Sequence, residues 1–196
     1  MTAALAILAR VATIVCAGAL VGLHALPTGY RPLHDAVSDY GVGKHRVWYR
    51  VQASALGAAG LLLAGALWGG VDPAPLKTIL CLVAFGVARI AIPWFPTDLE
   101  GQKRTSTGRV HLRLAAVAFL AVAIAAPAFH SAIRHNPDWT GIARLLGALG
   151  WAVTGAALAT ALSLRIPGLR PWFGLIERLL YVTMIAWFLV VSIHVA

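Results

Sequence analysis

Charged side chains are scarce in this sequence. They make up 12% of its 196 residues and include only seven aspartates and glutamates, whereas soluble domains carry charge on roughly a quarter of their residues. Hydrophobic residues make up 60% of the chain, so too little polar material remains to form a hydrated shell around a soluble core. The composition therefore excludes an ordinary soluble domain. It predicts one compact unit whose apolar surface is solvated by a lipid bilayer.

Cysteine and the short motifs of common catalytic sites are also nearly missing. The two cysteines, Cys16 and Cys81, lie inside apolar runs without a CxxC spacing, which is typical of small buried hydrophobic residues. No HExxH, HxxxH, GxSxG or Walker motif occurs, and no helix carries a histidine pair placed to hold haem. The standard zinc, haem, serine-hydrolase and nucleotide-binding signatures are therefore absent, and no cofactor is indicated.

Long apolar runs dominate what is present. A bilayer core about 30 Å thick is crossed by a helix of about 20 apolar residues, whose backbone groups must bond within their own segment. Six runs qualify: Thr2–Leu26, Val47–Gly70, Pro75–Trp94, Gly108–His130, Trp139–Leu164 and Trp172–Val195. The first run exceeds the roughly 7–15 residues of a signal-peptide core and follows no basic cluster, so we interpret it as a retained helix. The sequence predicts an all-α fold, a single domain over residues 1–196 built from six transmembrane helices.

The positive charge gathers on one side of the predicted bundle. The formal net charge is +9. Six spans place both termini on one side of the membrane and the loops after spans one, three and five on the other. Twelve lysines and arginines belong to that loop side and four to the terminal side. Cytoplasmic loops carry an excess of such residues, so we expect the loop side to be cytoplasmic and attribute the charge to topology and lipid phosphates, not to nucleic acid.

Polar residues near the spans collect on the same side. Ionisable groups at membrane depth are costly and usually face the bundle interior or water, and the arginine fork suits phosphate. The candidate ligand-binding residues are Ser38, Asp39, Arg50, Arg89, Asp98, His111, Arg113 and Glu177. The leading hypothesis is a non-enzymatic membrane protein whose loop-side pocket binds an anionic lipid headgroup or a small polar ligand.

Other interpretations of the same residues stay open. Asp39, Asp98 and His111 could serve an intramembrane enzyme as acid and base, or hold a metal that activates water. More plainly, Asp98 could cap a turn, Ser38 and Asp39 could cap the short helix that enters the second span, and His111 could be a hydrogen-bonded core residue. Arg50 and Arg89 could anchor helices at the interface. A partner-binding subunit without any pocket is a third possibility.

Helical spacing constrains the start of the fourth span. Arg109 and Arg113 are four residues apart and share a face, while His111 points roughly the opposite way. If His111 faces inward, Arg113 reaches out to the lipid headgroups. If Arg113 faces inward, it can pair with Glu177 or Asp98.

Two segments resemble signatures of a known family. LHALPTGYRPLHDAVSDYGVG after the first span and FPTDLEGQKRTSTGRVH before the fourth are similar to conserved segments of the bacterial and archaeal membrane proteins called domain of unknown function 998. The matching positions are Ser38, Asp39, Tyr40, Gly41, Phe95, Pro96, Thr97, Asp98, Gly108 and His111. The resemblance covers nearly the whole chain and implies six spans in a prokaryotic cytoplasmic membrane. It implies no particular activity, since the family name declares none.

Overall fold

The computed structural model describes all 196 residues and contains helices without strands. The long helices are α1 (Thr2–Ala25), α2 (Arg46–Gly70), α3 (Leu76–Ala91), α4 (Ser106–Ile133), α5 (Thr140–Ser163) and α6 (Phe173–His194). The 3-10 helices η1 (Val37–Gly41), η2 (Ile92–Trp94), η3 (Pro137–Trp139) and η4 (Pro167–Trp172) lie in or beside the connections. Together with the 3-10 helices η2, η3 and η4 that adjoin them, the six long helices form six segments long and apolar enough to cross a membrane, so the predicted all-α bundle of six spans is confirmed.

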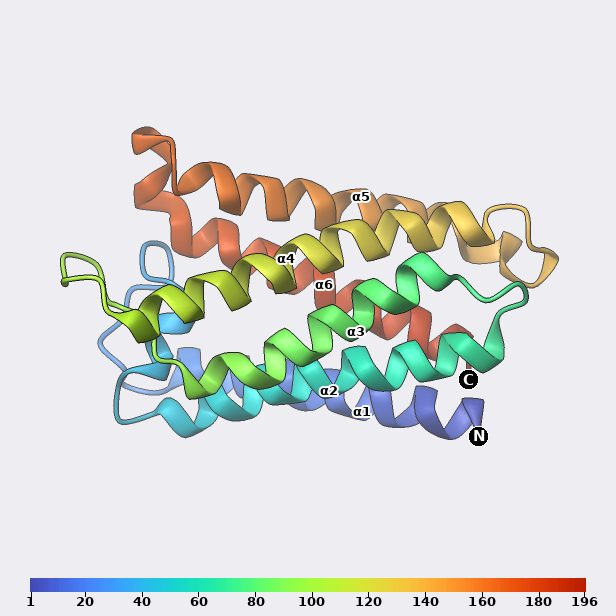
Figure 1. Cartoon of the computed structure of the whole chain (residues 1–196), viewed down its shortest axis with the longest axis horizontal. Helices are drawn as coiled ribbons and strands as arrows, with labels where there is room; N and C mark the ends of the chain where they lie inside the picture. Colours follow the sequence, from blue (N-terminus) through green and yellow to red (C-terminus); the bar gives the residue numbers. More distant parts are fainter.

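The helices run alternately up and down in one closed bundle (Figure 1). Each helix packs against the next one along the chain, and α6 returns to pack against α1. The connections after α1, α3 and α5 lie at one end of the bundle, which we call the loop end (Figure 1). Both termini and the other two connections lie at the opposite end, which we call the terminal end (Figure 1).

Small residues bring α2 and α3 close together. A Cβ atom added to Gly57 would lie 2.8 Å from the carbonyl oxygen of Gly86, and one added to Gly86 would lie 2.8 Å from that of Gly57. Membrane helices gain little from hydrophobic burial against each other, because lipid is equally apolar, so they associate through close backbone packing. The two glycines allow that packing at the α2–α3 crossing.

A proline inside α4 is compensated by α5. Pro127 has no backbone N–H, so the carbonyl oxygen of Ala123 one turn earlier lacks its usual helical donor. The hydroxyl of Thr154 on α5 donates to that oxygen at 2.7 Å. Gly150 lies one turn before Thr154, where an added Cβ would be 3.0 Å from the carbonyl carbon of Ala126. Pro127 therefore joins α4 to α5 through a hydrogen bond that is satisfied inside the protein, as lipid requires.

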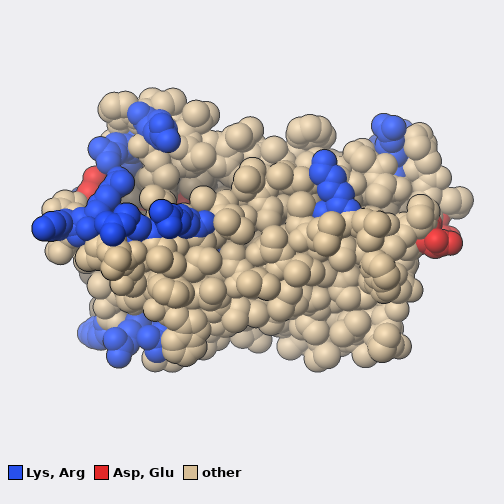
Figure 2. Space-filling model, in the orientation of Figure 1, with Lys and Arg blue, Asp and Glu red and all other residues tan.

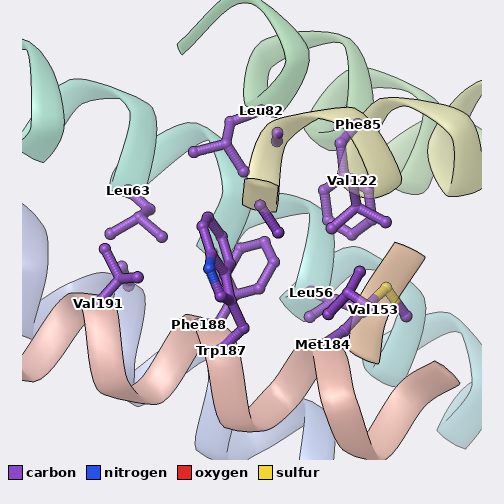
Figure 3. Close-up of a cluster of buried hydrophobic side chains, with 14 of the residues drawn as sticks. Leu56, Leu63, Leu82, Phe85, Val122, Val153, Met184, Trp187, Phe188 and Val191 are labelled. Atoms are coloured by element: carbon purple, nitrogen blue, oxygen red, sulfur yellow. The ribbon is translucent and has the colours of Figure 1, made fainter. Parts of the chain in front are cut away.

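Large apolar side chains fill the middle of the bundle. Trp187 and Phe188 on α6 lie among buried leucine, valine and aromatic side chains of the surrounding helices (Figure 3). The ring centroids of Trp187 and Phe188 are 5.3 Å apart, and those of Trp187 and Phe129 are 6.0 Å apart, both edge-on. This packing separates the polar groups of the loop end from those of the terminal end.

Candidate functional site

The first loop, residues 26–45, is docked on the start of α6. The backbone N–H of Leu175 donates to the carbonyl oxygen of Leu33 at 3.1 Å. A Cβ atom added to Gly174 would lie 2.6 Å from the carbonyl oxygen of Asp35, so a glycine is needed where the loop crosses the helix. The loop is therefore held by backbone contact as well as by side chains.

Glu177 holds this loop through a hydrogen bond to its backbone. Its side chain is 4% exposed, and its Oε2 accepts a hydrogen bond from the backbone N–H of Val37 at 2.7 Å. Val37 begins η1, the short helix that contains the SDYG residues, and η1 packs against both α2 and α6. Glu177 was predicted to be a site residue, and the structure gives it a buried position at the loop end with a backbone group as its partner.

Arg178 connects the first loop to two transmembrane helices. Its partners are Nε2 of His24 at 2.7 Å, the carbonyl oxygens of Asp35 and Gly174 at 2.9 Å each, and the hydroxyl of Tyr40 at 3.1 Å. The guanidinium carbon also lies 5.7 Å from the centroid of the Tyr40 ring. Arg178 was not predicted as a site residue. The available signal was its position directly after Glu177, at the end of the bundle where the other polar residues collect.

Asp39 and Ser38 lie within η1. The Oδ2 atom of Asp39 accepts a hydrogen bond from the backbone N–H of Ala36 at 3.0 Å, so the carboxyl caps the short helix. Burial raises the pKa of Asp39 to about 6. Ser38 is half-buried, and its hydroxyl makes no hydrogen bond within the protein. The capping role proposed for this pair is thus present for Asp39.

The residues of the FPTD segment fasten the loop between α3 and α4. Asp98 accepts hydrogen bonds from the backbone N–H and the hydroxyl of Thr105, at 2.9 and 2.8 Å, and these bonds hold the pKa of Asp98 below its usual range. Thr105 in turn caps α4 by accepting from the N–H of Gly108 at 3.0 Å. An added Cβ on Gly108 would overlap the Asp98 carboxylate. His111 Nδ1 donates to the carbonyl oxygen of Phe95 at 2.7 Å.

This arrangement gives the second signature a structural explanation. Asp98, the last residue of FPTD, acts together with Gly108 and His111 to hold this loop against the first turns of α4. The structure gathers no group of three histidine, cysteine or acidic side chains that could hold a metal ion. The residues of the metal alternative, Asp39, Asp98 and His111, are thus not brought together as ligands.

Two of the predicted arginines lie away from the interior. His111 is buried, and Arg113 is exposed together with Arg109, which corresponds to the first of the two arrangements allowed by helical spacing. Arg50 is half-buried, with its guanidinium carbon 5.1 Å from the ring centroid of Trp94. Arg50 and Trp94 therefore form a stacked pair at the loop end, and Arg113 faces outward from α4.

Arg89 on α3 is the one predicted arginine inside the bundle. Its side chain is 1% exposed. One of its terminal nitrogens donates to Oε1 of Gln52 at 3.1 Å, and the guanidinium carbon lies 5.4 Å from the ring centroid of Tyr181. The buried Nε atom has no hydrogen-bond partner. The only ion pair of the protein, at 4.0 Å, joins Arg31 to Asp35, so Arg89 has no carboxylate within that distance.

Polar groups from several helices surround this cation. Gln52 is completely buried, and its amide nitrogen lies 3.4 Å from the sulfur of Cys16 on α1. Tyr49 on α2 and Tyr181 on α6 are buried as well. Of the eight predicted residues, the structure buries Arg89, His111 and Glu177, and no ion pair joins Arg89 to Glu177.

The fold and this polar end define an integral membrane protein with six spans and an elaborate loop-side cap. Residues 10–194 match the family model described as "Protein of unknown function (DUF998)", and the chain belongs to that family. The match confirms the resemblance and covers both signature segments. No curated protein and no solved structure matches the chain.

Proposed function

We propose that this membrane protein binds an anionic group at Arg89, beneath the first loop. The anion would be the phosphate of a lipid headgroup or the acidic group of a small polar ligand. The observation that carries the proposal is the burial of the Arg89 guanidinium without any carboxylate within 4.0 Å. Glu177 and the first loop would enclose the bound group.

The energetics of an unpaired buried cation support this function. Desolvating a guanidinium costs several kcal/mol even after the protein relaxes. The amide oxygen of Gln52 and the face of Tyr181 offset part of that cost, since a cation–π contact contributes about 0.5–2 kcal/mol. A ligand anion would supply the missing negative charge and accept hydrogen bonds from the planar fork in a bidentate manner. Arg89 is thus better explained by a ligand than by the folded chain alone.

Arg89 would be reached by movement of the first loop. The hollow within that loop, lined by Tyr30, Tyr40 and His45 among others, does not border Arg89 and has a volume of about 20 Å³. That volume is room for about one water molecule. The loop is joined to α6 through Glu177 and Arg178, so release of these contacts would open a path from the aqueous face. A bound anion would then stabilise the closed loop.

The placement of the basic residues supports a membrane orientation. Lysine and arginine side chains gather at the loop end of the bundle in the view of Figure 2. Because such an excess marks cytoplasmic loops, we assign the loop end to the cytoplasmic side of a prokaryotic cytoplasmic membrane. The ligand would then be reached from the cytoplasm or from the inner leaflet.

The test compares two arginines that differ in their partners. Arg89→Met removes the buried cation, whereas Arg10→Met removes a half-buried arginine that donates to the carbonyl oxygen of Ser192 at 2.8 Å. Thermal unfolding of purified protein in detergent is followed with and without two probes, inorganic phosphate and a short-chain phosphatidylglycerol, against phosphatidylcholine. Wild-type protein is expected to gain stability with one of the probes, by about 3 kcal/mol at a hundredfold excess over its Kd.

The two variants are expected to respond in opposite ways. Arg89→Met should match or exceed the wild-type Tm without probe, because an apolar side chain replaces an unpaired charge. It should lose the response to the probe when both proteins carry Arg109→Gln/Arg113→Gln, which removes lipid binding on the outer face of α4. Arg10→Met should lower the Tm and keep the response. Stabilisation by phosphate alone identifies a soluble anion, and stabilisation by phosphatidylglycerol alone identifies a lipid headgroup. The proposal fails if Arg89→Met unfolds earlier than wild type and both proteins respond equally to each probe.

A further inference from the structure

Arg109 and Arg113 form a pair of exposed cations on the outer face of α4. Both side chains are exposed, and neither has a carboxylate within 4.0 Å. They lie four residues apart and therefore side by side on the helix. Figure 2 shows basic side chains that extend from the loop end along one side of the bundle.

The charge of this pair is balanced only in part within the protein. The carboxylate of Asp98 interacts with Arg109 at a distance, but it forms no ion pair with Arg109 or Arg113 within 4.0 Å. The first turn of α4 contains no acidic residue. Like charges four residues apart destabilise a helix, and a cation near the helix N-terminus is unfavourable as well. An external anion beside Arg109 and Arg113 would remove both costs.

The position of the pair along α4 matches the headgroup region. α4 has 28 residues and is therefore about 42 Å long, some 12 Å longer than a hydrocarbon core of about 30 Å. Arg109 and Arg113 lie within its first eight residues, where a helix of this length can extend beyond the hydrocarbon core. Leu112 and Val117, which are 49% and 47% exposed, lie next to the pair and deeper along the helix, where they would contact acyl chains.

We propose that Arg109 and Arg113 bind the phosphate of an anionic phospholipid in the loop-side leaflet. Two adjacent guanidinium groups suit the several oxygens of one phosphate. A lipid such as phosphatidylglycerol fits better than a zwitterionic lipid, whose own amine competes with the arginines for the phosphate. This site is separate from Arg89, because His111 faces the interior from the opposite side of the same helical turns.

The experiment measures lipid selectivity. Full-length protein is reconstituted in nanodiscs of equimolar phosphatidylglycerol and phosphatidylcholine, and native mass spectrometry counts the lipids of each type that remain bound. The double variant Arg109→Gln/Arg113→Gln is compared with Arg134→Gln/Arg144→Gln, which removes the same charge from exposed positions at the terminal end. Wild type and the terminal-end variant should retain phosphatidylglycerol preferentially. In the α4 variant the ratio of bound phosphatidylglycerol to bound phosphatidylcholine should fall about tenfold.

Two further readouts keep the proposal falsifiable if the α4 variant folds poorly. Arg109→Lys/Arg113→Lys keeps the charge but loses the bidentate fork, so its preference should be intermediate. Rising salt should weaken the wild-type preference. Equal retention of the two lipids by wild type would overturn the site, and so would an equal loss in both glutamine variants, which would indicate net charge alone. Arg89→Met should leave this preference unchanged, because the two sites are separate, and an equal loss of preference in that variant would overturn a separate site on α4.

Discussion

The arginines inside the two ends of the bundle have different partners. At the terminal end, Arg10 donates to the carbonyl oxygen of Ser192, and His130 to that of Ala143 at 2.9 Å. Ser192 lies in the last turn of α6, where carbonyl groups lack helical donors and the helix dipole favours a cation. At the loop end, Arg89 faces a neutral amide and an aromatic ring instead.

The comparison isolates what is unusual about Arg89. Both arginines leave a buried Nε atom without a partner, so that feature does not separate them. The other loop-end groups, Asp98, His111 and Glu177, all bond to backbone atoms, as the terminal-end groups do. Arg89 therefore differs from Arg10 in its partners, which are a side-chain amide and an aromatic ring in place of a carbonyl oxygen at a helix end.

Substitution of Arg178 at the loop end should lower the stability of the protein more than the other changes considered. Arg178→Met removes one hydrogen bond to α1, two to the first loop and one within α6. The free energy of unfolding should fall by about 3 kcal/mol, because several partners at the loop end lose their donor. Hydrogen–deuterium exchange should rise in residues 26–45. Arg170→Met, at an exposed position of η4, is the control, and an equal effect there would contradict the role of Arg178.

The attachment of the loop between α3 and α4 to the start of α4 is tested at Gly108. Gly108→Ala forces a methyl group into the Asp98 carboxylate, and thermal unfolding should show a loss of about 2 kcal/mol. Gly155→Ala, where an added Cβ meets open space, should be neutral or slightly stabilising. The double variant Gly108→Ala/Asp98→Ala removes the clash, so it should cost less than the sum of its parts. Simple additivity would show that the two groups do not interact.

A smaller effect concerns the pH dependence of the first loop. Burial raises the pKa of Asp39 from 3.8 to about 6, so the loop should be held most firmly below pH about 4 and lose that stabilisation as the pH rises through about 6. In the Asp39→Asn variant the side chain stays neutral at every pH. At pH 7 the free energy of opening of residues 26–45, measured by hydrogen exchange, should therefore be roughly 1–2 kcal/mol higher than in wild type. Asp72→Asn at the exposed terminal end should leave the profile unchanged.

The smallest effect lies away from the loop end, at the α4–α5 crossing. Thr154→Val removes the donor for the Ala123 carbonyl and should cost about 1 kcal/mol in thermal unfolding. Pro127→Ala restores a backbone N–H that can donate to the same oxygen, so the double variant should recover most of the loss. No recovery would mean that Thr154 contributes through packing instead of through this hydrogen bond.

The spans were predictable from the sequence, while their ends were less so. Uninterrupted apolar length fixes a membrane helix, and all six runs became helices. α4 begins at Ser106, two residues before the predicted Gly108, because Asp98 and Thr105 build a cap that depends on the path of the preceding loop. Hydropathy carries no information about such a cap.

The candidate site was predictable in location and less so in detail. Asp98, His111 and Glu177 were placed at the correct end of the bundle, but their partners are backbone atoms of loops whose path no local pattern specifies. Arg113 and His111 could not both face inward, and spacing alone did not decide between them. Burial of His111 against the Phe95 carbonyl decides it, and Arg113 faces outward as a result.

The closing of α6 against α1 has a consequence for how the chain can be made. Gly70 at the end of α2 lies against both Thr2 and Val195, so the start of α1 and the end of α6 lie close together. A short linker could join them, and new termini could be opened in any of the loop-end connections. Such circular permutants would place every helix in the same ring while changing the order in which the spans enter the membrane.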